Sequence, residues 1–596
     1  MKSSSSELTI AFTTIDRDES CKHAVTYLRS VFPESTLLVV EQNNPSYEMK
    51  QFYRENAVTV CYVGVDAGLS SARNKIMELV QTKYVLLCDD DIYRLDSGEV
   101  FKSLDFMERR GDVLAVGGRA SKIELHDDQS IERVNPDFDY KMMPSLERGY
   151  LVLQSVHMFD LQKYTRIEDG FYESDVVENF VLFDVSKLKR LNVGWDENIK
   201  IKNEHLDFYL SLKTCEDASD FKVVYNPFMI AAEIDGLGDN GPIDYKVKRT
   251  RNDFTAIYCN KWGLEREFHV GKWINVFDGY RYRTIPWSER NKYANEELER
   301  YKLIGEETRE RYEDYPVDAS RITFLATTME RYQVAESFVL SVRRFFPEAK
   351  VVLGVQASHF GEELDRMEKD YDVRVVRLPK DHGLSRSRND LLEYVSTDYF
   401  VLCDDDFVID EDFFLGNAYR VLEENPVIGV VGGYYRDVIY DRKLQFRNRM
   451  DRQFTMFFHV EEKTRSLIRV PFNYLSVERV FDEETRCVKV DCVNNLALFR
   501  TAIFTDGSVR WDDRMKISGE HIDFYFNLFQ RGGVGVVYDP SFSVLHNRRQ
   551  NVQYAKYRDR RDGINIFYDK WGIDNEIDFD FGYKKVASGV TQWVKF

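Results

Sequence analysis

Three consecutive aspartates occur twice in the sequence, each time directly after an apolar run. Residues 399–406 read YFVLCDDD, and residues 84–91 read YVLLCDDD. Carboxylates gathered at the end of a buried strand repel one another unless a cation lies among them. Mg²⁺ and Mn²⁺ bind carboxylate oxygens and are often shared with substrate phosphates. The two triplets therefore predict sites for a divalent cation and a phosphate group.

Side chains alternate along an extended strand end, so the members of a triplet have different surroundings. Asp404 and Asp406 should point to one side and Asp405 to the other. We assign Asp406 to the cation, and Asp404 and Asp405 to the nucleotide, where a carboxylate can accept a ribose hydroxyl. A single triplet could equally be a loop of solvated acids, but its duplication favours a functional site. The matching residues of the first triplet are Asp91, Asp89 and Asp90.

A glycine-containing loop and a helix start precede each apolar run. In the second copy, Gly383 permits a tight turn, and the helix beginning there would offer free N–H groups to an anion. Arg388 could pair with a diphosphate or with the loop residue Asp381. A capped helix with an Arg–Asp ion pair is the purely structural alternative. The first copy has Gly68, Arg73 and Asp66 at these positions.

A Glu-His-x-Asp segment, also duplicated, supplies candidates for a general base. Transfer to a hydroxyl group requires a base that takes up its proton. Both Glu520 and His521 are suited to this task, and Asp523 follows them; the sequence leaves the choice of base open. A helix cap beside a buried histidine is the structural alternative. The first copy reads Glu204, His205 and Asp207.

One histidine follows a late apolar strand. His546 comes directly after DPSFSVL, and alignment on Pro540 and Pro227 places Glu233 at the equivalent position of the first copy. Either side chain could complete the ligand set of the cation, because Glu also binds hard cations. A surface histidine beside two arginines is the alternative.

Alternating strands and helices position these segments. LTIAFTT (8–14) and LLVVEQN (37–43) predict two strands separated by a helix, and ITFLATT (322–328) and VVLGVQ (351–356) repeat the pattern. Such strand–helix–strand units are typical of an α/β protein with a parallel sheet. Ligands of open α/β sheets bind outside the carboxyl ends of the strands, where both triplets should lie.

The repeated segments define two domains. Asp89 and Asp404 are 315 positions apart, and the spacing is still 316 residues at the Glu-His-x-Asp segments. A chain of 596 residues also exceeds the size of a single hydrophobic core. We predict domains over residues 1–290 and 319–596, joined by a solvated, highly charged linker helix over residues 291–318.

The composition limits the classes of function. A hydrophobic content of 43% fits a globular chain, and a net charge of −19 argues against a nucleic-acid partner. No segment approaches the roughly 18 apolar residues of a membrane-spanning helix, and the start MKSSSSELTIAF lacks a secretion signal. We expect a soluble, cytoplasmic protein without a transmembrane segment. Peripheral association with the inner membrane face and the oligomeric state stay open.

The chain resembles nucleotide-sugar glycosyltransferases of the GT-A fold at HGLSRSRN (382–389), YFVLCDDDF (399–407), GEHIDFY (519–525) and SVLHN (543–547). The resemblance covers both halves and points to family 2, especially its β-1,4-N-acetylgalactosaminyltransferase-like branch, although Ala67 replaces the first histidine in the first half. It implies two tandem Rossmann-like GT-A domains. It also implies an inverting transfer from a UDP-sugar that requires Mn²⁺ or Mg²⁺.

The resemblance implies roles for individual residues as well. Asp404, Asp405 and Asp406 would hold ribose and metal, and His546 is a candidate metal ligand. Related enzymes carry the base in a Glu-Asp pair, which here reads Glu520-His521, so the choice between these two stays open. The residues expected near the nucleotide are Thr327, Gln356 and Arg388, with Thr13, Gln42 and Arg73 in the first domain.

We therefore predict a bifunctional glycosyltransferase that adds sugars to a glycan, polysaccharide or glycolipid. In the main alternative only the second domain is catalytic, and the first binds acceptor or supports assembly, since Glu233 stands in place of histidine. Retention of both triplets argues against a carbohydrate-binding scaffold with dead sites. A nucleotidyltransferase would show a Gly-rich, basic loop after the first strand, which neither TTIDRDE (13–19) nor TTMERYQ (327–333) supplies.

Overall fold

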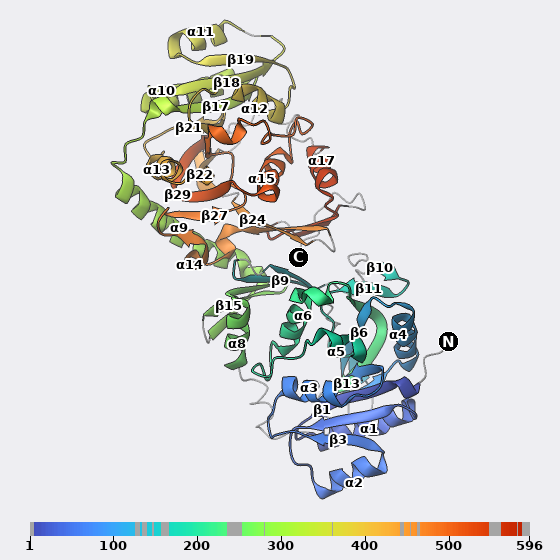
Figure 1. Cartoon of the computed structure of the whole chain (residues 1–596). Coiled ribbons are helices and arrows are strands. Elements are labelled where there is room, and N and C mark those ends of the chain that lie inside the picture. The colour runs from blue at the N-terminus through green and yellow to red at the C-terminus, as the bar shows by residue number, and fades with distance from the viewer. Residues whose placement is uncertain are drawn as a thin grey trace. The chain divides into compact units, whose positions relative to one another are not determined.

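The chain of this computed structural model divides into two compact units, Met1–Ser288 and Glu289–Phe596 (Figure 1). The structure describes residues 5–596 except 126–130, 134–139, 146–147, 156–165, 235–252, 279–280, 360, 441–445, 453–454, 462–464, 548–561, 581 and 587–596. Both units are α/β domains built around one large sheet, so the predicted fold class of two tandem Rossmann-like domains is confirmed.

The first four strands of the first unit are parallel and lie in the order β3–β2–β1–β4. Alternate residues of β1 enter different cores, with Ile10 and Phe12 on one face of the sheet and Ala11 on the other. Strands that are buried on both faces need apolar residues almost throughout, and the central strands β1, β2 and β4 have them. These elements are β1 (Leu8–Thr14), α1 (Asp18–Val31), β2 (Thr36–Glu41), α2 (Tyr47–Glu55), β3 (Val58–Tyr62), α3 (Leu69–Leu79) and β4 (Tyr84–Leu87).

The other half of this sheet departs from the predicted parallel arrangement. Strand β12 lies between β4 and β6 and is antiparallel to both, while β6 and β13 are parallel to each other. Strand β5, which follows the aspartate triplet, pairs with the end of β13. The elements are β5 (Ile92–Leu95), α4 (Ser97–Arg109), β6 (Val113–Leu125), β7 (Ile131–Arg133), β10 (Arg166–Glu168), β11 (Phe171–Ser174), β12 (Val181–Asp184), α5 (Val185–Leu191), α6 (Glu204–Thr214), β13 (Lys222–Ile234) and α8 (Asp253–Trp262).

The second unit repeats the same sheet, in the order β19–β18–β17–β20–β28–β22–β29. Strand β28 is again the antiparallel member, between β20 and β22. The elements are β17 (Ile322–Met329), α10 (Tyr332–Phe345), β18 (Lys350–Ala357), α11 (Glu362–Tyr371), β19 (Arg374–Pro379), α12 (Leu384–Leu392), β20 (Tyr399–Asp404), β21 (Phe407–Val408), α13 (Gly416–Glu424), β22 (Ile428–Tyr440), β23 (Phe446–Arg452), α14 (Val477–Val480), β26 (Phe481–Asp482), β27 (Cys487–Val490), β28 (Ala497–Arg500), α15 (Glu520–Arg531), β29 (Gly535–Asn547) and α17 (Asp562–Trp571).

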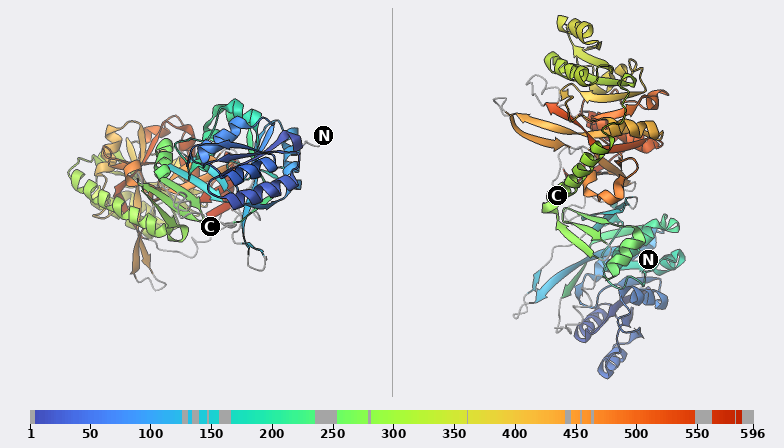
Figure 2. Two further views of the ribbon diagram at one scale, coloured as in Figure 1. Left: turned by 90° about the horizontal axis from the view of Figure 1, so that it is seen from below. Right: turned by 90° about the vertical axis from the view of Figure 1, so that its left-hand side faces the viewer.

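Each unit also has a smaller sheet that the sequence did not predict. In the first unit β9 and β14 are parallel neighbours, and in the second unit β25 and β30 take the same places. Strands β22 and β23 of the large sheet form a long antiparallel hairpin (Figure 2). The strands of the small sheets are β8 (Tyr140–Ser145), β9 (Tyr150–Ser155), β14 (Arg266–Val270), β15 (Trp273–Asp278), β16 (Arg281–Pro286), β24 (Met456–Glu461), β25 (Ser466–Pro471), β30 (Asn575–Asp578) and β31 (Gly582–Lys585).

The charged segment after the first domain forms one helix, α9 (Arg290–Tyr312), but this helix is not the solvated linker that we expected. Tyr293 and Tyr301 are buried, and Gly305 lies so close to β29 that a Cβ atom there would be 2.3 Å from the carbonyl oxygen of Pro540. A stripe of aromatic and small residues every four positions gives the helix a packing face despite its charge. Helix α9 therefore belongs to the second unit.

Candidate functional site

In the first unit, a cavity of about 320 Å³ opens beside the aspartate triplet. The triplet follows β4 directly, at the carboxyl end of the parallel strands. Helix α6 contributes its first residues to the opposite wall. The cavity thus collects residues that are far apart in the sequence. Its lining includes the predicted residues Thr13, Gln42, Asp66, Arg73, Asp89, Asp90, Glu204 and His205.

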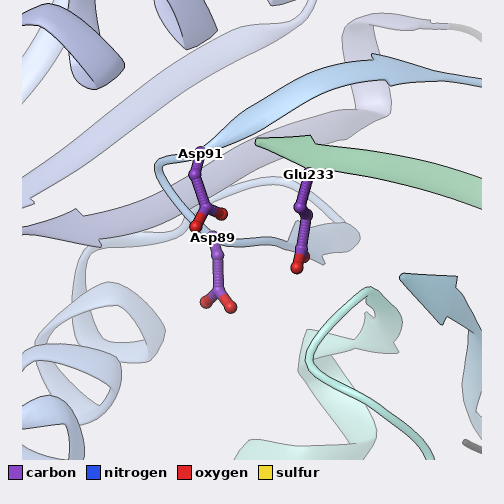
Figure 3. A group of neighbouring side chains, drawn as sticks. All are labelled: Asp89, Asp91 and Glu233. Atoms are coloured by element: carbon purple, nitrogen blue, oxygen red, sulfur yellow. The ribbon is translucent and has the colours of Figure 1, made fainter. Parts of the chain in front are cut away.

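Three carboxylates meet at one edge of this site. Ligand oxygens of Asp89, Asp91 and Glu233 all lie within 4.8 Å of one another (Figure 3). The pairing of β5 with β13 brings them together, because Glu233 lies opposite Ile92, the residue after the triplet. Hard oxygen donors at this spacing suit Mg²⁺ or Mn²⁺. The predicted metal residues Asp91 and Glu233 are therefore neighbours, and Asp89 joins them.

The middle aspartate of each triplet is turned into the protein. Asp90 accepts hydrogen bonds from the Thr14 hydroxyl (2.7 Å) and from Arg17. In the second unit, Asp405 accepts one from Thr328 (2.6 Å) and lies 3.4 Å from Arg331. Burial raises the pKa of both carboxyls to about 7, although each has an arginine beside it. Asp90 also lines the cavity, and the nucleotide contact expected of these two aspartates stays a prediction.

The first aspartate of each triplet is held by an asparagine that sequence reasoning missed. Asn179 donates its side-chain N–H to Asp89, and Asn495 donates to Asp404 at 3.2 Å. Both asparagines precede the antiparallel strand of the large sheet, in the duplicated segments VENFVLFD and VNNLALFR. Their recurrence was a signal that could have identified them. Arg17 and Arg331 each lie three residues after the threonine that binds the middle aspartate, and this repeat was a second such signal.

The second unit carries its histidine at the position of Glu233. The Nε2 atom of His546 lies 3.2 Å from Asp406, and its Nδ1 atom lies 2.5 Å from Asp437. Burial alone would lower the pKa of His546, but Asp406 and Asp437 raise it to about 9. His546 is therefore buried beside Asp406, as its predicted role as a metal ligand requires, and not a surface histidine. Asp437 was not predicted.

The glycine loops are built as expected, but their N–H groups are already in use. Gly68 has φ +96°, and a Cβ atom there would be 2.6 Å from Lys200. Its N–H donates to Gln42 (2.9 Å), and the N–H of Leu69 donates to the Lys200 carbonyl (2.8 Å). Gly383 and Leu384 repeat these contacts with Gln356 (3.1 Å) and Lys516 (2.7 Å). The prediction of free N–H groups for an anion is wrong at these positions.

The loop arginines contact a glutamate and not the loop aspartates. Arg73 donates to Glu204 at 3.0 Å, and Arg388 lies 3.8 Å from Glu520. Lysines occupy the place we considered for the arginines: Lys200 donates to the Asp66 carbonyl (3.1 Å), and Lys516 donates to the Asp381 carboxylate (3.1 Å). The predicted Arg–Asp pairs are therefore wrong. Each guanidinium also lies over an indole ring, at 5.9 Å from Trp195 and 5.5 Å from Trp511.

The three members of the Glu-His-x-Asp segment have different surroundings. Glu204 and His205 line the cavity, at the first turn of α6. Nε2 of His205 donates to the Val177 carbonyl at 2.5 Å, as Nε2 of His521 does to Val493. Burial lowers the pKa of His521 to about 4, so this imidazole is neutral and its Nε2 is occupied.

The aspartates of these segments are not available for chemistry. Asp207 is fully buried and accepts hydrogen bonds from Lys261 (2.9 Å) and Trp262 (2.8 Å). Asp523 does the same with Lys570 (2.8 Å) and Trp571 (2.7 Å). The catalytic role predicted for Asp207 and Asp523 is replaced by a structural one, because these contacts fix α8 on α6 and α17 on α15. Thr327 lies half-buried at the end of β17, next to Thr328.

Residues 326–478 match the family described as glycosyl transferase family 2. This match lies entirely within the second unit and includes its aspartate triplet. No helix in the described part of the chain combines the length and apolar character that a membrane crossing requires.

Among curated proteins, the chain is similar to β-1,4 N-acetylgalactosaminyltransferase 1 of Mus musculus, with 29% identity over 119 residues. The human protein of that name is 30% identical over 117 residues. These matches cover 20% of this chain, and the chain spans about a fifth (21%) of the length of these relatives.

Solved structures with similar chains include GalNAc-T7 with UDP, GalNAc and Mn²⁺, at TM-score 0.32 and 16% identity over 40% of this chain and 45% of that one. The mannosyltransferase PcManGT from Pyrobaculum calidifontis, in complex with GDP-Man and Mn²⁺, matches at TM-score 0.27 and 9% identity, over 42% of this chain and 62% of that one. Similarity at this level carries no functional argument.

Proposed function

We propose that both units are glycosyltransferases that take a sugar from a UDP-sugar, with Mn²⁺ or Mg²⁺, and transfer it to a hydroxyl group of a glycan, polysaccharide or glycolipid. The observation that supports this most is the group Asp89, Asp91 and Glu233 beside a cavity lined by Glu204. A cation site and a carboxylate that face one cavity are what transfer from a nucleotide diphosphate to a hydroxyl requires.

The residues divide between donor and acceptor. Asp89, Asp91 and Glu233 would hold the cation in the first unit, and Asp404, Asp406 and His546 in the second. When bound, the cation neutralises charge on the leaving diphosphate. Asp90 and Asp405, together with their arginines, fix the triplets in place.

Glu204 and Glu520 would take the proton of the acceptor hydroxyl. Each carboxylate lies at the first turn of a helix, with an arginine beside it that holds its orientation. Attack by the hydroxyl on the anomeric carbon then expels the diphosphate from the opposite face, which inverts the configuration. His205 and His521 are less suited, because Nε2 of each ring already donates to a backbone carbonyl.

A second candidate function has only the second unit catalytic, with the first binding acceptor or supporting assembly. The family match supports it, because that match lies within the second unit alone. The three carboxylates that meet in the first unit instead support the first candidate, in which each unit has its own active site.

Release of UDP from a panel of UDP-sugars with Mn²⁺ tests both candidates. We expect Asp91→Ala and Asp406→Ala each to abolish turnover of a different sugar, with a loss of at least about 100-fold. Asp217→Ala, an exposed aspartate of the first unit, is the control and should match the wild type. An unchanged Asp91→Ala profile would leave only the second candidate, and no UDP release by any form would overturn both.

A further inference from the structure

Helices α8 and α17 occupy the same place in the two units but differ in the second residue of their first turn, among others. Each begins with an aspartate and ends in a Lys-Trp pair, and each pair binds the buried aspartate of α6 or α15. Phe254 of α8 therefore corresponds to Gly563 of α17.

In the second unit this position cannot carry a side chain. A Cβ atom on Gly563 would be 2.0 Å from the Ser518 carbonyl oxygen, and one on Gly519 would be 2.9 Å from Cα of Ile564. The backbone of α17 thus lies directly against the residues that precede Glu520. Position 563 therefore offers no side chain to the start of α15.

In the first unit a side-chain contact replaces this backbone contact. Asn203 stands where the second unit has Gly519, and its side-chain oxygen accepts a hydrogen bond from Thr255 of α8 (3.1 Å). The ring of Phe254 is half-buried, lines the cavity, and shares that lining with Glu204 and His205. At this position an accessible aromatic ring thus lines the cavity of the first unit, whereas the second unit has a glycine.

We infer that Phe254 forms one wall of an acceptor-sugar subsite in the first unit, where its ring packs against the apolar face of a pyranose. This rests on the proposed function. A half-buried ring offers an apolar surface of the size of a sugar face at little cost in conformational entropy. The Thr255–Asn203 hydrogen bond holds the start of α8 against the residue that precedes Glu204, and we therefore place the ring near the acceptor hydroxyl that Glu204 would touch. The matching position of the second unit is Gly563, which supplies no ring.

Kinetics in an Asp406→Ala background, which silences the second unit, test the assignment. The acceptor probes are the methyl glycosides of glucose, galactose, N-acetylglucosamine and N-acetylgalactosamine. Phe254→Ala should raise the KM of the preferred glycoside about tenfold and leave the KM of the UDP-sugar unchanged. Phe254→Tyr should stay near the parent, as should Ile257→Ala, an exposed position on the same helix. A rise in the UDP-sugar KM alone would place the ring against the donor and overturn the acceptor assignment.

Saturation-transfer NMR with the same glycosides, in the presence of UDP and Mn²⁺, needs no turnover. We expect transfer from the protein to one glycoside, lost in Phe254→Ala and kept in Phe254→Tyr and Ile257→Ala. Equal transfer in wild type and Phe254→Ala, or none to any glycoside, would overturn the inference. If the Asp406→Ala protein binds a glycoside through Phe254 but releases no UDP, the first unit binds acceptor without being catalytic. That result would contradict the proposed function and leave the inference intact.

Discussion

The carboxylate and imidazole that follow each other at the start of α15 have different neighbours. Glu520 is buried beside the guanidinium of Arg388, at 3.8 Å. His521 donates from Nε2 to the Val493 carbonyl, and burial lowers its pKa to about 4. A base must have a free acceptor atom near the hydroxyl. The contacts therefore favour Glu520 over His521, a choice that residue types alone left open.

Conservative substitutions separate the two candidates. Glu520→Gln keeps the size of the side chain but removes its basicity, so kcat for the sugar of the second unit should fall by about 10²–10⁴. His521→Asn can still donate to Val493 and should lose less than about tenfold. Mn²⁺ binding, measured by electron paramagnetic resonance, should be unchanged in both. The reverse order of kcat losses would make His521 the base.

Local patterns identified the triplets but not the residues that hold them. The triplets could be predicted because they directly follow an apolar run in the sequence. The recurrence of Arg17 and Asn179 marks them as candidates, but the partners of Arg17, Asn179 and Lys200 could not be assigned, because these lie 73, 90 and 134 positions away. The hydrogen bonds that occupy the N–H groups of the glycine loops could not be predicted for the same reason. The Lys200 carbonyl, which accepts from Leu69, belongs to a segment that is distant in the sequence and is brought near only by the fold.

At the scale of elements, the small sheets differ in how they bury one glutamate. Glu267 of β14 is buried, and its carboxyl group accepts a hydrogen bond from the side chain of Asn275 (3.1 Å). Burial raises the pKa of Glu267 to about 7. Glu576 occupies the same position in β30, but it pairs with Arg469 at 2.8 Å and accepts a hydrogen bond from Tyr568. The small sheet of the first unit therefore buries a glutamate whose protonated form is favoured, whereas that of the second unit buries a glutamate–arginine ion pair.

This difference predicts opposite responses to substitution. The pKa of Glu267 is higher in the folded chain than its usual value near 4.5, so its contribution to stability is complete at low pH and is lost as pH rises through about 7. Glu267→Gln should therefore raise the unfolding free energy of the first unit by about 1–3 kcal/mol at pH 8.5, and with it the melting temperature. At pH 4.5 the substitution should change both quantities little. Calorimetry at the two pH values measures it.

Glu576→Gln is the matched comparison, because it removes one partner of a buried ion pair. We expect it to destabilise the second unit by about 3–5 kcal/mol at pH 8.5. Stabilisation of both units, or of neither, at pH 8.5 would contradict the assignment of an unpaired acid to Glu267.

Element types were more predictable than their directions. The apolar runs and helix patterns of both halves gave the parallel strands β1, β2, β17 and β18 because each lies within a local strand–helix–strand unit. Strands β12 and β28 are apolar as well, and nothing in their composition distinguishes an antiparallel neighbour. In α9, likewise, the many charged residues led us to predict a solvated helix, although one face of it packs on β29.

At the scale of the whole molecule, the two units have separate cores, and α9 packs on the second unit through the contact of Tyr301 with Phe472. We expect two unfolding transitions in calorimetry. Tyr301→Ala removes a ring that is fully buried in α9 and should lower the second unit's transition alone, by about 3–5 kcal/mol. Leu303→Ala, at 61% exposure on the same helix, should shift neither. A shift of both transitions by Tyr301→Ala would show that α9 supports the two units together.

The position that carries Glu233 or His546 lies on a strand with a different neighbour in each unit. In the register of the large sheets, His546 is opposite Asp437, whereas Glu233 is opposite Lys122. The residue types at these two register positions therefore differ together between the units. An engineer who wishes to convert one unit into the other must transplant both positions together. A single exchange would place an aspartate opposite Glu233, or a histidine opposite Lys122, in the register of the sheet.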